Sequence, residues 1–188
     1  MDMGALLAAP FAAGESDGMS AEELARFNTL PLAAAREVLL ACCNSPTWAD
    51  RMAAGRPYSS ARDAVRQSSA IVTMLTVPDL EAALSGHPRI GERAAGASQS
   101  ADWSRAEQAA AATTDDATRR ELAESNAEYE RRFGHVYLVC ASGRSAETLL
   151  SVLHARLRNK PEREWHVVRG ELQKINEIRL VKLLAGTR

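Results

Sequence analysis

The stretch PEREWHVVRGELQKINEIRLVKLL, residues 161–184, repeats apolar residues at helical spacing. Val168, Leu172, Ile175 and Leu183 fall on one face, and this stripe predicts a long helix that packs its apolar side against a core. The same 3.6-residue period dominates the chain upstream, so the pattern favours a helical fold throughout.

Working outward from this stretch, the period and its interruptions predict most of the remaining elements. Further helices are expected over residues 32–43, 48–54, 59–75, 77–84, 101–113, 115–132 and 145–158. Ser20 and Glu23 have the spacing of a capping box, so order should begin at Ser20. Residues 1–19 are weakly patterned, and we expect them to be flexible. We predict an all-α fold, a single compact domain of about eight helices over residues 20–188.

One segment departs from the helical period. Residues 135–140, HVYLVC, are rich in β-branched and aromatic side chains, which is typical of extended backbone. No other stretch offers a convincing partner strand. We therefore predict one short extended segment inside a helical protein, and no sheet.

Charge and cysteine content exclude several classes of protein. The 23 basic and 24 acidic residues give a net charge of −1, which predicts no nucleic-acid partner and no anionic membrane partner. No apolar stretch is long enough to span a bilayer. Cys42, Cys43 and Cys140 lack disulfide or zinc spacing, and reduced thiols favour a cytoplasmic location. Asp2 precedes the N-terminal apolar run, so we expect no signal peptide.

His87 is the most suggestive residue for chemistry. It follows a predicted helix in the run SGHPRIGE, where Gly86 frees the backbone and Pro88 restricts it. Histidine changes charge near neutral pH, so a histidine held on a rigid turn is suited to acid/base work. The alternative is an ordinary surface or capping histidine.

Two further features suggest a polar site. Ser104, Glu107 and Gln108 share one helix face, which offers a hydroxyl, a carboxylate and an amide to a ligand, or forms a solvated polar face. Arg179 lies in the middle of the apolar stripe of the last helix, where its desolvation is costly. It either binds a substrate or protein carboxylate or extends to the surface along its own stem. Cys140 has no neighbouring feature that activates it as a nucleophile.

Several short motifs occur together in a fixed order. They are FN at 27–28, CCNSPTWA at 42–49, RPY at 56–58, HPRIGE at 87–92, SRAEQ at 104–108, NxxYxxxFG at 126–134 and KINEIRL at 174–180. In this order and spacing the chain, from Phe27 onward, resembles the OHCU decarboxylase family, whose substrate is 2-oxo-4-hydroxy-4-carboxy-5-ureidoimidazoline (OHCU). Much of that family reads HPDLG where this chain reads HPRIG, a form that looks like a bacterial branch. The roles of Arg89 and Glu92 stay open.

The resemblance implies a carboxy-lyase that converts OHCU to (S)-allantoin in urate degradation, without cofactor or metal, as a homodimer. It implies that His87 is the catalytic acid/base and that Glu107, beside it, is the second catalytic residue. Residues implied to bind substrate are Pro88, Ser104, Gln108, Val139, Cys140, Ala141, Ser142, Gly143 and Arg179. We expect Glu107 to hold the imidazole and favour its charged form.

Two other interpretations remain open. A different cofactor-free lyase or hydrolase that acts on another ureido or imidazolone compound would use the same polar groups. A helical interaction module without an active site would instead leave His87 exposed, pair Arg179 within the protein and present an apolar groove.

Overall fold

The computed structural model describes residues 17–91, 99–109 and 115–185, and every regular element within these ranges is an α-helix. The helices are α1 (Asp17–Thr29), α2 (Leu32–Cys42), α3 (Pro46–Ala54), α4 (Ala61–Met74), α5 (Val77–Leu84), α6 (Gln99–Glu107), α7 (Asp116–Phe133), α8 (Ala146–Arg156) and α9 (Pro161–Ala185). The predicted all-α fold is confirmed, with nine helices described where about eight were expected. The predicted flexible segment, residues 1–19, lies largely outside the described residues and stays a prediction.

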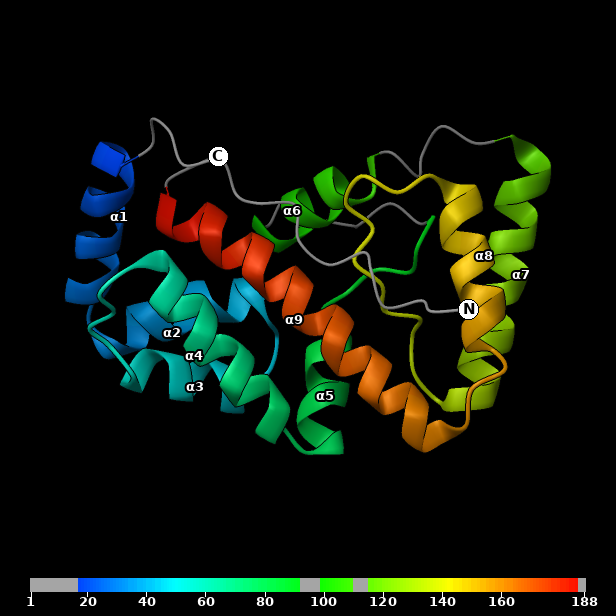
Figure 1. Ribbon diagram of the computed structural model, residues 1–188, viewed down its shortest axis with the longest axis horizontal. Helices are drawn as coiled ribbons and strands as arrows, with labels where there is room; N and C mark the ends of the chain where they lie inside the picture. The colour runs from blue at the N-terminus through cyan, green and yellow to red at the C-terminus, as the bar shows by residue number, and fades with distance from the viewer. Residues whose placement is uncertain (1–16, 92–98, 110–114, 186–188) are drawn as a thin grey trace, which may run out of the picture.

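The long helix α9 organises the molecule. Figure 1 shows it running diagonally between α1–α4 at one end and α7–α8 at the other. Val168, Leu172 and Ile175 are buried, as the stripe predicted, while Leu183 is only partly buried. The main core gathers around α9, and a second cluster joins α7, α8 and the segment between them. Burial of these apolar faces supplies the main driving force for the fold.

Polar side chains mark where the helices begin. A hydroxyl or carboxylate accepts from a free backbone N–H in the first turn of α3, α4, α5, α7 and α8, which stabilises each start. The capping side chains are Ser45, Ser60, Thr76, Asp115 and Ser145. The expected cap at Ser20 is wrong, because α1 already includes Ser20 and extends back to Asp17. Helix α6 ends at Glu107, before the predicted residue 113.

Two of the sequence motifs lie against each other and serve the fold. The Asn28 side chain donates to the Tyr58 carbonyl and accepts from the Tyr58 N–H, both at 2.9 Å. Arg56 donates to the carbonyls of Phe27 (2.7 Å) and Leu30 (2.8 Å) at the end of α1. Such bonds satisfy carbonyls that a helix end leaves unpaired. The FN and RPY motifs therefore join α1 to the chain that follows α3.

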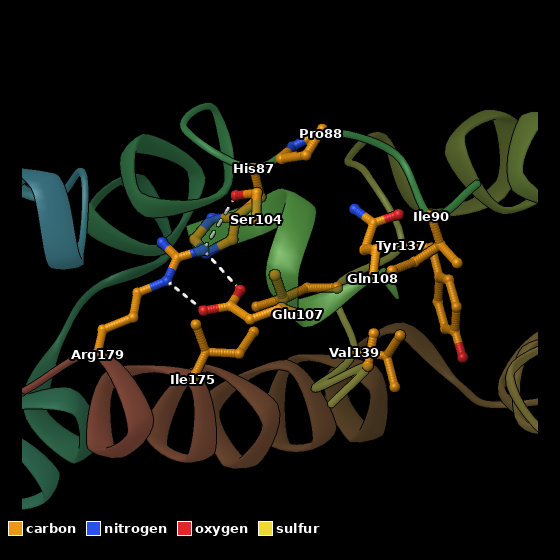
Figure 2. A pocket seen from close by; sticks show the side chains of 12 residues that line it. His87, Pro88, Ile90, Ser104, Glu107, Gln108, Tyr137, Val139, Ile175 and Arg179 are labelled. Carbon is orange, nitrogen blue, oxygen red and sulfur yellow. Dashed lines mark hydrogen bonds and ion pairs between the residues drawn. The ribbon is translucent and has the colours of Figure 1, made fainter. Parts of the chain in front are cut away.

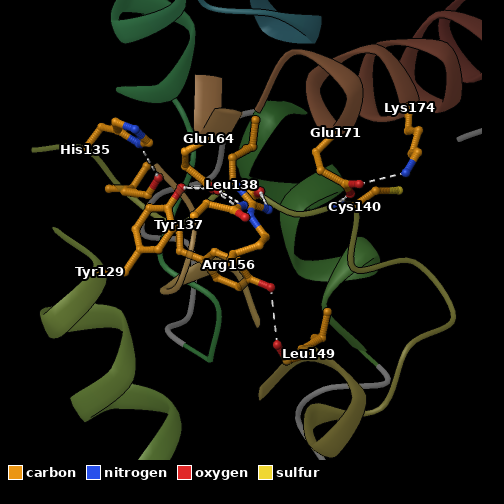
Figure 3. Close-up of polar contacts among 12 residues, drawn as sticks. Tyr129, His135, Tyr137, Leu138, Cys140, Leu149, Arg156, Glu164, Glu171 and Lys174 are labelled. Atoms are coloured by element: carbon orange, nitrogen blue, oxygen red, sulfur yellow. Dashed lines mark hydrogen bonds and ion pairs between the residues drawn. The ribbon is translucent and has the colours of Figure 1, made fainter. Parts of the chain in front are cut away.

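The segment between α7 and α8 is irregular, as predicted. Gly134 ends α7 with φ +78°, and residues 135–141 then run without helix or strand pairing. In place of a partner strand, side chains from α8 and α9 bind this segment (Figure 3).

The described residues include no helix that is both long and apolar enough to cross a membrane.

Two glycine substitutions should change stability in opposite directions. Gly134→Ala forces a Cβ into the left-handed region without a clash, and should cost about 1–2 kcal/mol of unfolding free energy. Gly170→Ala, inside α9 with open space around its Cβ, should stabilise by about 0.5–1 kcal/mol. Urea unfolding of both variants checks this, and shifts of the same sign would contradict either the left-handed end of α7 at Gly134 or the open space around Gly170 inside α9.

Candidate active site

A small pocket lies where the loop after α5, helix α6, the irregular segment and α9 meet (Figure 2). Its lining residues are His87, Pro88, Ile90, Ser104, Glu107, Gln108, Tyr137, Leu138, Val139, Ala141, Ile175 and Arg179. The centre of a water molecule can occupy about 20 Å³ here, and one water needs about 10–15 Å³. A larger ligand therefore requires the lining side chains to move apart.

The backbone after α5 fixes the position of His87. The His87 N–H donates to the Leu84 carbonyl at 3.0 Å. A Cβ on Gly86 would lie 2.6 Å from the Cβ of Asn44, so glycine is needed for close packing at this point. The sequence analysis assigned Gly86 a role in backbone freedom, whereas the structure gives it a role in close approach.

The hydrogen bond of His87 determines which ring nitrogen carries the proton. Nδ1 lies 3.0 Å from the Ala83 carbonyl oxygen. A carbonyl can only accept, so Nδ1 must be the protonated nitrogen, and in the neutral ring Nε2 carries a lone pair. Nε2 is buried and has no hydrogen-bond partner. The imidazole thus presents an unused proton acceptor at the pocket.

The surroundings of His87 favour its neutral form. Burial, followed by the positive charge of Arg179, lowers the pKa of His87 to about 4, although the bond to the Ala83 carbonyl opposes the shift. At neutral pH the unliganded protein therefore holds a neutral imidazole, which is ready to act as a base.

All three guanidinium nitrogens of Arg179 bond within the protein. Its side chain is 2 % exposed, and it donates to both oxygens of Glu107, from Nε at 2.9 Å and from Nη2 at 2.8 Å. It also donates to the Ser104 hydroxyl and to the Cys42 carbonyl, both at 3.1 Å. Of the alternatives left open by the sequence, the buried protein carboxylate is the one observed. Planar guanidinium matches carboxylate geometry, so the pair is well suited to burial.

The expectation that Glu107 holds the imidazole is not met in this structure. Both Glu107 oxygens bind Arg179 (Figure 2), and the pKa of His87 is lowered, not raised. The physical reason is that Arg179 needs a full counter-charge in the apolar interior, and Glu107 is the carboxylate that reaches it. Glu107 nevertheless lines the same pocket as His87.

The remaining predicted residues divide into two groups. Pro88, Ser104, Gln108, Val139 and Ala141 line the pocket with His87, Glu107 and Arg179. Cys140, Ser142 and Gly143 do not line it, because the Cys140 N–H turns toward Glu171 and the other two are exposed in a turn. Substrate contact by any of these residues stays a prediction.

The Gln108 side chain connects two walls of the pocket. Its Oε1 accepts from the Gly91 N–H at 3.0 Å, which ties the loop after His87 to the end of α6. Its amide nitrogen makes no bond to any residue that the structure describes, and so offers two donors to a ligand.

Arg89, whose role the sequence left open, forms a two-point ion pair with Glu130 at 2.6 and 2.9 Å. Glu92 lies outside the described residues.

Four apolar or aromatic lining residues were missed by sequence reasoning: Ile90, Tyr137, Leu138 and Ile175. Two signals were available. Ile175 precedes Arg179 by four residues, so both project from one face of α9. Tyr137 precedes Val139 by two residues, and alternate residues of an extended chain share a face.

The described residues contain no group of three or more side chains suited to hold a metal ion. All three cysteines are free. Burial raises the pKa of Cys43 to about 11 and also raises the pKa of Cys140, so neither is an activated thiolate. Histidine and the polar groups around it are therefore the chemically competent features of this pocket.

Comparison with known proteins places this geometry in a family. The chain is 34% identical over 148 residues to the uric acid degradation bifunctional protein TTL of Arabidopsis thaliana, covering 77% of this chain but only 45% of that protein. It is 28% identical over 141 residues to 2-oxo-4-hydroxy-4-carboxy-5-ureidoimidazoline decarboxylase of Amia calva, covering 74% and 81% of the two chains.

Solved structures agree with the sequence comparison. A crystal structure of OHCU decarboxylase in the presence of (S)-allantoin superposes with a TM-score of 0.68 at 33% identity, over 77% of this chain and 95% of that one. A structure of (S)-allantoin synthase, at 17% identity and a TM-score of 0.65, shares the fold over 85% and 53% of the two chains. The family model for OHCU decarboxylase matches residues 28–181. The chain therefore belongs to the OHCU decarboxylase family.

Proposed function

We propose that the protein removes CO₂ from OHCU and forms (S)-allantoin in urate degradation. The observation that carries the proposal is the buried His87, whose unpaired Nε2 lies at a pocket that Ser104, Glu107 and Gln108 also line. The family relationship supports the same reaction, as do relatives named for OHCU decarboxylation. The bacterial branch suggested by HPRIG stays a prediction.

The reaction needs an electron sink and controlled proton transfer. When the C4–carboxylate bond breaks, CO₂ departs and the electron pair enters the adjacent C=N system, whose nitrogen takes a proton from water. The C4 hydroxyl then loses its proton as a carbonyl forms, and one ring carbon gains a proton. His87 Nε2 accepts the hydroxyl proton, and the resulting imidazolium returns a proton to carbon from one face. A positioned acid/base group contributes about 10²–10⁴-fold to such a rate.

The Arg179–Glu107 pair supplies a fixed electrostatic environment beside His87. Burial, followed by the positive charge of Arg179, keeps the resting imidazole neutral, and the substrate carboxylate offsets part of that charge once bound. The Gln108 amide donates to ring carbonyl or ureido oxygens. Ser104, which accepts from Arg179, lies beside these donors in the pocket. The proposal requires no cofactor, because the substrate itself accepts the electron pair.

The alternative of an interaction module without an active site agrees with one observation and disagrees with two. Arg179 is paired within the protein, as that alternative expected. However, the His87 Nε2 is buried, and the pocket is lined by a histidine, a carboxylate, an amide and a hydroxyl. An interaction surface does not need a buried unpaired acceptor of this kind.

Two further features are part of the proposal. The first is a homodimer, taken from the family resemblance, which sedimentation equilibrium tests. The second is a cytoplasmic location, taken from the reduced cysteines, which fractionation of the source cells tests. Neither nucleic acid nor a membrane is required for the proposed reaction.

His87→Gln should reduce kcat by about a hundredfold to ten-thousandfold, because the proton acceptor is lost. OHCU is generated in place from urate with urate oxidase and hydroxyisourate hydrolase, and (S)-allantoin is followed by circular dichroism. His166→Gln, at an exposed position of α9, is the matched control and should keep wild-type turnover. Wild-type rates in the His87 variant would remove His87 from the mechanism.

The pH dependence of kcat/KM should reflect the lowered pKa of His87. The base works only when unprotonated, so activity falls as pH decreases through about 4, the pKa in the folded, unliganded protein. An unperturbed histidine would place this acid limb near pH 6.5. Rate profiles from pH 7.5 to 3 measure the limb, and a midpoint near 6.5 would contradict the buried neutral imidazole.

Arg179→Met should lower the free energy of unfolding by about 3–5 kcal/mol, because Glu107 is left buried without its counter-charge. The double variant Arg179→Met, Glu107→Leu should recover most of that stability, yet stay inactive. Urea unfolding and allantoin formation are measured on the same samples. A stable, active double variant would show that the pair contributes to packing alone.

A further inference from the structure

A second buried ion pair joins α8 to α9 and contacts the irregular segment between α7 and α8. Arg156 of α8 is 4 % exposed and Glu164 of α9 is 0 % exposed. Arg156 contacts Glu164 Oε1 from Nε at 2.7 Å and from Nη2 at 2.6 Å. Tyr129 donates to the same oxygen, and Asn159 donates to Oε2 at 2.6 Å. Three side chains thus bind Glu164, and Figure 3 labels two of them, Tyr129 and Arg156.

The remaining contacts of Arg156 lead directly to the pocket wall. Its Nη1 donates to the Leu138 carbonyl at 2.6 Å, and its guanidinium carbon lies 4.8 Å from the centre of the Tyr137 ring. Tyr137 and Leu138 both line the pocket that contains His87. The Arg156 guanidinium therefore contacts the pocket wall, by which we mean residues 137–139, from the side away from the pocket.

Stability alone does not account for this arrangement. Burying two opposite charges costs so much desolvation that a well-packed apolar pair is often as stable or more stable. What an apolar pair cannot do is bind a backbone carbonyl in one defined direction. The flat guanidinium, with donors on all three nitrogens, can hold Glu164 and Leu138 at the same time.

The segment needs such a support because it has no partner strand. Glu171 of α9 binds the Cys140 N–H at 2.8 Å, so side chains bind the residues on either side of Val139. Val139 lines the pocket, and within the described chain its own N–H and C=O make no hydrogen bond. Neighbouring residues of an extended chain direct their backbone groups to opposite edges. Binding of one edge by Arg156 and Glu171 leaves the groups of Val139 available to a ligand.

We propose that Arg156 is a positioning residue for the active site: held by Glu164, it fixes the Leu138 carbonyl and the Tyr137 ring, and through them the wall around Val139. The inference rests on the proposed function for its kinetic consequence, but the fixing of the wall can be measured without turnover.

Arg156→Lys is the decisive variant, because it keeps the positive charge beside Glu164 while a single nitrogen replaces three. Lysine cannot hold Glu164 and the Leu138 carbonyl in the same geometry and loses the flat contact with Tyr137. The matched control is Arg158→Lys, two residues on and exposed. Val72→Ala is a second control that lowers stability, in the core at α4, a helix that contributes no residue to the pocket lining.

Hydrogen exchange should show faster exchange of the amides at residues 136–141 in Arg156→Lys, with α4 unchanged. Because an error of 1 Å in position can cost about 10²-fold in rate, kcat/KM for OHCU should fall by about tenfold to a hundredfold. KM should rise as well, and Arg158→Lys and Val72→Ala should keep wild-type KM.

The outcomes separate the two proposals. Wild-type exchange at residues 136–141 in Arg156→Lys would overturn the positioning role, whatever the activity. Faster local exchange with unchanged kcat/KM would also overturn it, since the wall would not matter to the reaction. Wild-type protein that fails to convert OHCU would refute the proposed function, while the exchange measurement would still decide whether Arg156 fixes the wall.

Discussion

A guanidinium buried in the apolar face of α9 is the constraint on which the rest of the site depends. Arg179 cannot stay in the interior without acceptors, because the desolvation of an unpaired charge costs several kcal/mol. The acceptors come from Glu107 and Ser104 of α6 and from the carbonyl of Cys42 at the end of α2. Satisfying one side chain thus brings three distant parts of the chain together, and the pocket forms beside them.

The chemistry of His87 follows from that arrangement. A backbone carbonyl one turn earlier determines which ring nitrogen carries the proton, and Arg179 helps to keep the ring neutral. Neither effect needs a carboxylate next to the imidazole. Glu107 contributes by neutralising Arg179, so that a full positive charge is not left unpaired beside a base that must later become positive itself.

Helix α9 carries one member of each buried ion pair. Glu164 lies in its first turn and Arg179 is 15 positions further on, a distance of about 22 Å along the helix axis. Between them lie Glu171, which binds the irregular segment, and Ile175, which lines the pocket. One rigid helix therefore sets the spacing between the acid/base side of the site and the wall opposite, which suits a reaction that depends on position.

The sequence by itself determined the helical class, most helix boundaries, the extended nature of residues 135–140 and the family, because periodicity, capping residues and motif order are local properties of the chain. It also selected eight residues that line one pocket. Only the tertiary structure decided that Glu107 pairs with Arg179 and that His87 bonds to Ala83. It likewise decided that Arg156 supports the wall. The Glu107–Arg179 contact joins residues 72 positions apart, whereas the His87 bond spans only four positions. Which carboxylate reaches a buried cation depends on how helices pack, and no local pattern encodes that choice.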